Sequence, residues 1–94
     1  MHATIRHYEG IENPTELLRQ LNETFMPAIK AIPGFVTYAF VDVGDAGGRM
    51  VSTSVFESEE GTDASNKLAA EWVAARPGLI PTAKLVEAGH VVAS

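Results

Sequence analysis

The sequence predicts one α+β domain with the element order β-α-β-β-α-β. Three observations predict it: a short chain of 94 residues, four stretches with strand-like patterns, and two helical patterns between them. A chain of this length forms a single domain, 1–94, and buries only roughly 60% of the surface that its unfolded form exposes. Its core is marginal alone, and association of copies is a common remedy.

The composition excludes several classes of protein. The net charge is −5, with acidic residues spread along the chain, which argues against nucleic acid and anionic membranes as partners. The chain has no cysteine, so disulfides, thiolate nucleophiles and iron–sulfur clusters are excluded. No run of about 18 apolar residues predicts a membrane span. The N-terminal residues lack the pattern of a signal peptide, and we expect a cytoplasmic protein.

The first strand and the first helix are predicted within residues 2–33. Residues 2–9 alternate, with Ala3, Ile5 and His7 on one face and His2, Thr4, Arg6 and Tyr8 on the other. The run Asn13-Pro14-Thr15-Glu16 has the pattern of a helix start. Apolar residues follow at helical spacing: Leu17, Leu18, Leu21, Phe25 and Ile29. Pro27 inside this pattern predicts a kink or a restart of the helix.

Residues 35–41 predict a strand that is apolar on both faces. We expect Phe35, Ala39 and Val41 on one face and Val36, Tyr38 and Phe40 on the other. A strand of a small open sheet usually alternates apolar and polar residues, so here both faces need cover.

The rest of the chain predicts a hairpin, a helix and a last strand. Gly44, Gly47 and Gly48 indicate a turn, after which residues 50–57 return as the second strand of the hairpin. Ser58 is a plausible cap for the next helix, which Pro77-Gly78 ends. The apolar stripe of that helix is Ala64, Leu68, Trp72 and Ala75. Residues 83–92 form the last predicted strand.

This order of elements has a well-populated solution, the ferredoxin-like split βαβ arrangement. It places four strands in an antiparallel sheet and both helices on one of its faces. The other face stays bare, although strand 35–41 is apolar on both sides. Burying about 600 Å² of apolar surface per chain would contribute roughly 15 kcal/mol before the costs of association. We therefore expect a homodimer that packs sheet on sheet.

Three segments resemble a known family. They are Ile32-Pro33-Gly34-Phe35-Val36-Thr37-Tyr38, Ser54-Val55-Phe56-Glu57 and Ser65-Asn66-x-x-Ala69-Ala70-Glu71-Trp72-Val73. They resemble the dimeric α+β-barrel superfamily, which includes the antibiotic biosynthesis monooxygenases, and the resemblance covers nearly the whole chain. In the monooxygenase branch it implies an enzyme without a cofactor that oxidises electron-rich polycyclic phenols with O₂, in a pocket between the sheet and the helices.

The resemblance also implies the residue types of that pocket, which are Asn, Trp, Tyr and Arg. The candidates for catalysis in this chain are Arg6, Tyr38 and His7. The candidates for substrate binding are Trp72, Asn66, Tyr8 and Phe25. In the catalytic group, an Arg can neutralise a substrate anion and a His can accept a proton.

Four of these candidates have a structural alternative. Trp72 fits a core anchor as well as a pocket wall whose indole N–H orients a bound carbonyl. Asn66 lies six residues earlier, roughly 120° away around the helix, and fits a solvated surface residue. Tyr38 fits an interface or core aromatic, and Arg6 fits an ion pair with an acid across the dimer interface.

Metal binding is not predicted. His2 and His7 face opposite sides of their strand, and His2 and His90 can be neighbours but lack a third ligand. Two functions remain open. One is a cofactor-independent, monooxygenase-like enzyme acting on a small aromatic or polyketide-type substrate; the other is a non-enzymatic dimeric module that binds a small apolar or aromatic molecule.

Overall fold

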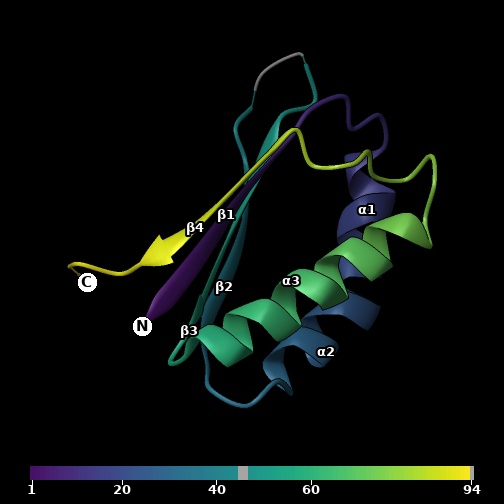
Figure 1. Ribbon diagram of the computed structural model, residues 1–94. Coiled ribbons are helices and arrows are strands. Elements are labelled where there is room, and N and C mark those ends of the chain that lie inside the picture. The colour runs from purple at the N-terminus through teal and green to yellow at the C-terminus, as the bar shows by residue number, and fades with distance from the viewer. Residues whose placement is uncertain (45–46, 94) are drawn as a thin grey trace.

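The computed structural model describes residues 1–44 and 47–93, and it confirms the predicted fold class. A four-stranded antiparallel sheet in the order β2-β3-β1-β4 carries the helices on one face (Figure 1). The elements are β1 (His2–Tyr8), α1 (Pro14–Gln20), the π turn η1 (Leu21–Phe25), α2 (Met26–Lys30), β2 (Phe35–Asp42), β3 (Met50–Phe56), α3 (Glu59–Ala74) and β4 (Leu85–His90). The last strand is shorter than the predicted range of 83–92.

The predicted interruption at Pro27 is present as a π turn between α1 and α2. Asn13 caps α1, because its Oδ1 accepts a hydrogen bond from the Glu16 backbone N–H at 3.2 Å. Pro27 has no N–H to donate to the carbonyl four residues before it, so the α-helical pattern cannot run through it unchanged. The chain widens into η1 and restarts as α2, with Pro27 in its first turn.

The register of β1 fixes which residues face the helices. Arg6 lies opposite Ser52 of β3 and opposite Val86 of β4. Arg6 and Tyr8 are buried beneath the helices, whereas Ile5 on the other face is 37% exposed. The face that the alternation predicts for Arg6 and Tyr8 is therefore the helix side.

A β-bulge in β2 overturns the predicted faces of this strand. The pairing of β2 with β3 shifts between Phe35 and Thr37. Phe35 packs its ring edge against Phe56 in the core, with centroids 5.7 Å apart, while Val36 is 43% exposed. The expectation that Val36 shares a face with Tyr38, with Phe35 opposite, is wrong, because the extra residue of the bulge shifts the alternation.

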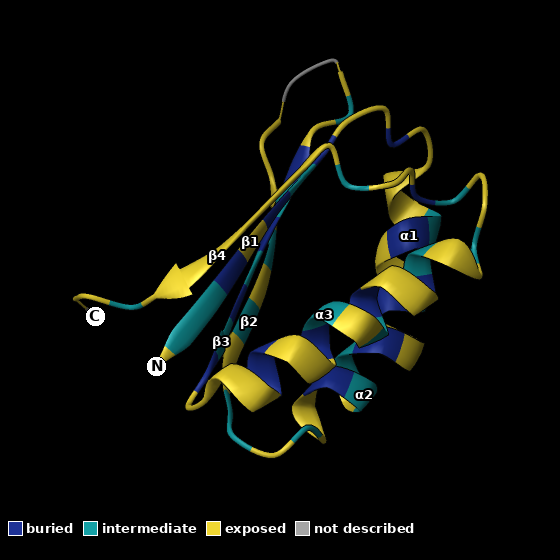
Figure 2. Ribbon diagram, in the orientation of Figure 1, coloured by how far each residue is buried: buried dark blue, intermediate teal, exposed yellow. Residues whose placement is uncertain are grey.

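The core lies between the helices and the inner face of the sheet (Figure 2). Its buried members come from all layers: Tyr8, Ile11, Leu17, Leu21, Phe25, Ile29, Met50, Phe56, Ala69, Trp72 and Ile80. The layers approach closely at Gly61, where a Cβ atom would lie 2.8 Å from the Phe56 ring. A larger residue at 61 would push α3 away from β3.

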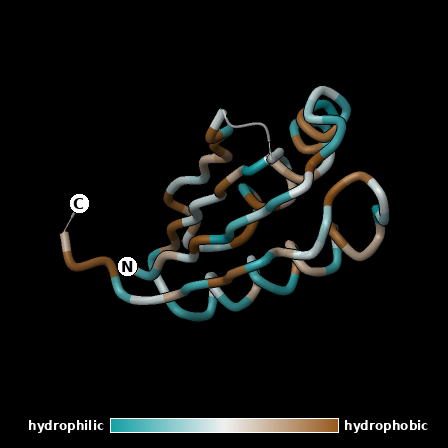
Figure 3. Tube along the Cα trace, turned by 90° about the horizontal axis from the view of Figure 1, so that it is seen from above, coloured by the Kyte–Doolittle hydropathy of each residue, from teal (hydrophilic) through white to brown (hydrophobic). Residues whose placement is uncertain are grey.

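The outer face of the sheet has no helix over it. Ile5, Val41 and Leu85 are exposed large hydrophobic residues of β1, β2 and β4. The trace seen from above shows hydrophobic stretches in the strands as well as along the helices (Figure 3). Among the described residues, every helix is too short or too polar to span a bilayer.

Candidate functional site

The main cavity lies between α3, the segment 77–83 and the inner face of β1 and β4. Its volume is about 440 Å³. Small and apolar residues form most of its wall, including Ala69, Ala70, Val73, Ile80 and Val86. Arg6 and Tyr8 enter it from β1. In the sequence, Pro77-Gly78 predicted only the end of a helix and residue 83 the start of the last strand, and neither signal indicated that the segment would wall a cavity.

The cavity narrows into an aromatic deep end. A void of about 10 Å³ is bordered there by Tyr8, Phe25, Tyr38, Phe40 and Trp72, together with Arg6 and Ser52. The ring of Phe25 is 5.3 Å from that of Tyr38 and 5.5 Å from that of Trp72, centroid to centroid. Such a void has room for about one water-sized molecule. The structure thus brings five of the seven predicted site residues to one place.

Arg6 is a buried charge without an acidic partner among the described residues. Its side chain is reached by little solvent, since the residue is 6% exposed. Its Nη2 donates a hydrogen bond to Oδ1 of Asn66 at 2.6 Å, and no carboxylate in residues 1–44 and 47–93 forms an ion pair with it. Arg6 points to the helices and not to the open face of the sheet, so a partner packed on that open face would not bring an acid to it.

Burial also decides the protonation of this cluster. It lowers the pKa of Arg6, and the nearby hydroxyls of Tyr8 and Tyr38 partly oppose that change. Burial raises the pKa of Tyr8 above its usual value. The pKa of Tyr38 is raised further, by burial first and by Tyr8 second, although a hydrogen bond with Ser52 works against it. Both tyrosines are therefore neutral hydrogen-bond donors at neutral pH, not bases.

Trp72 contributes its ring to the site and its N–H to helix packing. Nε1 donates to the Thr24 Oγ1 atom at 2.9 Å, and the Arg76 guanidinium lies 4.2 Å from the ring centroid. The indole N–H thus already has an acceptor in η1. The ring remains free to border the deep end of the cavity.

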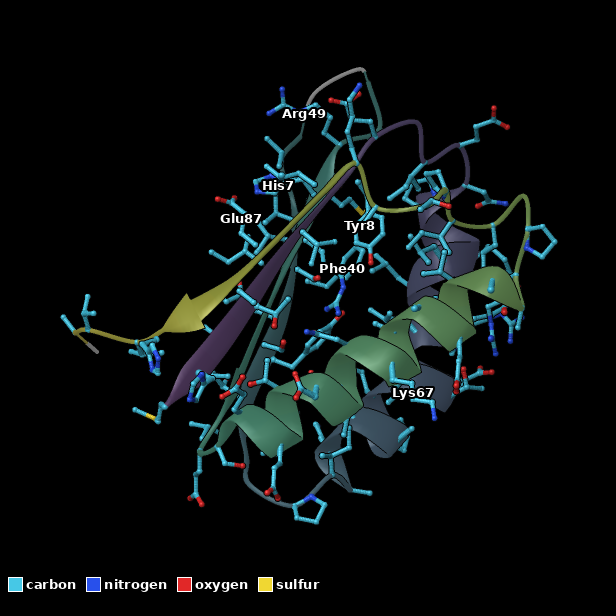
Figure 4. All side chains as sticks on the ribbon, in the orientation of Figure 1. His7, Tyr8, Phe40, Arg49, Lys67 and Glu87 are labelled. Carbon is cyan, nitrogen blue, oxygen red and sulfur yellow. The ribbon has the colours of Figure 1, made fainter. Side chains whose placement is uncertain are left out.

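His7 lies on the opposite face of the sheet from Arg6. Figure 4 shows His7 beside Glu87 on the outer face, with Tyr8 and Phe40 on the helix side. The distance from His7 Nε2 to Glu87 Oε1 is 3.4 Å. The structure therefore does not bring His7 to the cavity.

The histidines at the other end of β1 do meet. His2 is the register partner of His90, and their ring centroids are 4.3 Å apart. In the described part of the chain, no group of three or more His, Cys, Asp or Glu side chains is arranged to hold a metal ion.

No family model and no curated protein sequence matches the chain. Solved structures do match it in fold. A monooxygenase from Streptomyces coelicolor, ActVA-Orf6 in complex with Nanaomycin D, is 20% identical with a TM-score of 0.66, covering 99% of this chain and 92% of that one. The heme-degrader MhuD from Mycobacterium tuberculosis, solved with two hemes, is 18% identical with a TM-score of 0.71 and coverages of 100% and 98%.

A third match is a dimeric ferredoxin-like protein from an uncultured marine organism. It is 13% identical, with a TM-score of 0.71 and coverages of 100% and 97%. These structures confirm the ferredoxin-like fold that the sequence predicts. At this level of identity the likeness is one of fold, and the function has to be argued from the site.

Proposed function

We propose that this protein binds a small aromatic phenol as its anion and oxidises it with O₂, without a cofactor. The observation that carries the proposal is Arg6, a buried guanidinium that opens onto an apolar cavity of about 440 Å³ and has no acidic partner among the described residues. A buried cation of this kind is costly, and a bound anion would compensate it. The apolar walls fit an aromatic ring.

The reaction follows from the anion. Arg6 favours the phenolate over the phenol, and the phenolate is the form that gives electrons to O₂. Overall, a phenol and one O₂ give a quinone and one water: four electrons leave the phenol, one oxygen atom enters the ring as a second carbonyl, and the other leaves as water. Tyr8 and Tyr38 donate hydrogen bonds to developing negative charge, and the aromatic deep end excludes bulk water.

The likeness to a monooxygenase solved with Nanaomycin D supports this class of reaction. The likeness to a heme degrader gives less support to haem binding. In the described part of the chain, tyrosine is the only type of haem ligand that borders the cavity and its deep end, and burial keeps Tyr8 and Tyr38 protonated.

One observation favours binding without turnover. No described side chain that lines the cavity accepts a proton at neutral pH, since Arg6 is a cation and burial keeps Tyr8 neutral. The phenol would have to lose its proton to water. A module that only binds aromatic anions is therefore the second candidate function.

We further propose that the protein is a homodimer joined through the outer face of the sheet. Ile5, Val41 and Leu85 are large hydrophobic residues exposed on that face, where His7 and Glu87 also lie. A solved structure with this fold is described as a dimeric ferredoxin-like protein.

The test is quinone formation from electron-rich phenols. In air-saturated buffer, 1-naphthol and 1,5-dihydroxynaphthalene, which each have a free ring position para to a hydroxyl, should give quinone faster with the protein than without it. With isotope-labelled O₂, dihydroxynaphthalene should incorporate one labelled oxygen atom. Arg6→Met should lower the rate and the affinity by about tenfold or more. The control is Arg19→Met, because Arg19 lies on the outside of α1 and pairs with Glu16 and Glu23.

No acceleration with any phenol would leave only the binding function.

A further inference from the structure

A groove runs between α3 and β4, and it has two halves. The first half is the main cavity, with Ala70 and Val73 of α3 on one side and Val86 of β4 on the other. The second half is a hollow of about 280 Å³ nearer the start of α3, bordered by Asp63 and Asn66 of α3 and by Ala88 of β4. β4 is exposed along its whole length beside this groove (Figure 2).

Arg6 and Asn66 meet where the two halves join. Arg6 borders the first half and lies opposite Val86 in the register, whereas the next inward position of β1, Thr4, lies opposite Ala88 of the second half. Asn66 borders only the second half. Its hydrogen bond with Arg6 therefore crosses the groove from helix to sheet and separates the first half from the second.

The acceptor in this bond carries no charge. A carboxylate in the place of the Asn66 amide would form an ion pair with Arg6 and cancel the charge that an anionic ligand needs. An amide oxygen satisfies one guanidinium N–H without adding negative charge, and it leaves the other N–H groups for a ligand. The same bond closes the main cavity on the side of the second hollow.

We propose that Asn66 is a specificity-determining residue, which positions Arg6 as an uncompensated cation and limits the length of the ligand by dividing the groove. The inference rests on the proposed function, because it requires the main cavity to take an aromatic anion. Asn66 acts in it through Arg6, and contact with the ligand is not needed.

The charge is tested with Asn66→Asp. Calorimetric titration with naphthalene carboxylate, an unreactive aromatic anion, is compared with titration with the neutral naphthalene carboxamide. Asn66→Asp should lower the carboxylate affinity about tenfold or more and change the carboxamide affinity by less than about threefold. The thermal midpoint should not fall, since an ion pair replaces the hydrogen bond. The matched control is Asn22→Asp, on the exposed side of η1, which should change neither affinity.

The length is tested with Asn66→Ala and a ligand with one more ring. In Asn66→Ala the affinity for anthracene carboxylate should rise relative to the affinity for naphthalene carboxylate. The ratio of the two affinities should be about fivefold or more above the wild-type ratio. The ratio is the readout because a loosened Arg6 would weaken both ligands alike. An unchanged ratio would overturn the role of Asn66 in length selection.

The remaining outcomes separate this inference from the proposed function. Unchanged carboxylate affinity in Asn66→Asp overturns the inference, and so does an equal loss for carboxylate and carboxamide, which would indicate structural damage. If the wild type binds neither anion, the anion site is wrong and the inference fails with it. Anion binding by the wild type without quinone formation would remove the enzymatic function alone and leave the inference standing.

Discussion

At the scale of single residues, Arg6 gives the apolar cavity its positive charge. Taking a charge out of water costs several kcal/mol unless it is paired, and in the described chain Arg6 has an amide and two nearby hydroxyls but no carboxylate. Buried charges of this kind concentrate at functional sites. The cost is compensated when an anion occupies the cavity, so ligand affinity and ligand charge should be linked.

The two tyrosines of the chain make a prediction for alkaline pH. Burial raises the pKa of both Tyr8 and Tyr38, whereas in the unfolded chain each ionises near 10.0. Above that pH the folded state keeps protons that the unfolded state has released, so the free energy of unfolding falls as the pH rises. At about pH 10 we expect less tyrosinate absorbance from the folded protein than from the unfolded chain, with full ionisation only at higher pH.

Tyr38→Phe tests whether the buried tyrosines cause this fall in the free energy of unfolding at alkaline pH. It removes the group with the larger rise in pKa, so the fall in unfolding free energy above about pH 10 should become shallower. Half-ionised tyrosine in the folded wild type at that pH would show that the two hydroxyls are not buried.

At the scale of elements, η1 joins α1 to α2 and is bonded to α3. The π turn before Pro27 carries Leu21 and Phe25 into the deep end and Thr24 toward α3. Thr24 Oγ1 accepts hydrogen bonds from Trp72 Nε1 at 2.9 Å and from Arg76 Nη2 at 3.3 Å. The wall of the cavity is thus fixed from outside, by contacts that no ligand needs to make.

Thr24→Val should therefore destabilise the protein through Trp72. The indole N–H would lose its acceptor in a partly buried place, which costs about 1–3 kcal/mol of unfolding free energy. Chemical denaturation, followed by the fluorescence of the only tryptophan, measures this loss. Thr24→Ser keeps the hydroxyl and should retain most of the stability. Equal losses for the two variants would mean that the methyl group, not the hydrogen bond, matters.

The elements also show what the sequence could predict and why the rest needed the structure. Alternation in residues 2–9 placed Arg6 and Tyr8 on one face, and Pro27 marked the interruption of the first helix, because both signals are local. The bulge at Val36 contains no Gly or Pro of its own, and the Pro33-Gly34 pair before it indicates only the end of the helix. The bond between Arg6 and Asn66 joins residues 60 positions apart, so no spacing rule could reveal it. His7 shares a strand with Arg6, but the alternation that separates their faces was already visible.

At the scale of the whole molecule, the fold is a layer of helices on one face of a sheet. The helices cover the inner face of the sheet, and the outer face is bare (Figure 1). The groove opens beside β4. Because the cavity and the outer face lie on opposite sides of the sheet, a partner on the outer face would leave the entrance to the cavity open.

Ile5→Lys should separate the proposed dimer. Ile5 lies on β1, a central strand, and is 37% exposed on the outer face, so a charge there would have to be buried in the interface. Light scattering should give twice the chain mass for the wild type at micromolar concentration and the chain mass for the variant. The matched control is Leu18→Lys. Leu18 is 38% exposed on α1, away from the outer face of the sheet, so this variant should stay dimeric. A wild-type protein with the mass of one chain would contradict the proposed dimer.

The bulge in β2 has a consequence for changes in chain length. Val36 is the extra residue between Phe35 and Thr37, and both flanking segments already match β3 in register. Deleting it would restore plain alternation and leave Phe35 and Tyr38 facing the helices. A deletion anywhere from residue 38 to 42 would instead exchange the inner and outer side chains on one side of the gap. The bulge is therefore the place in this strand where the chain can lose a residue and still keep its core.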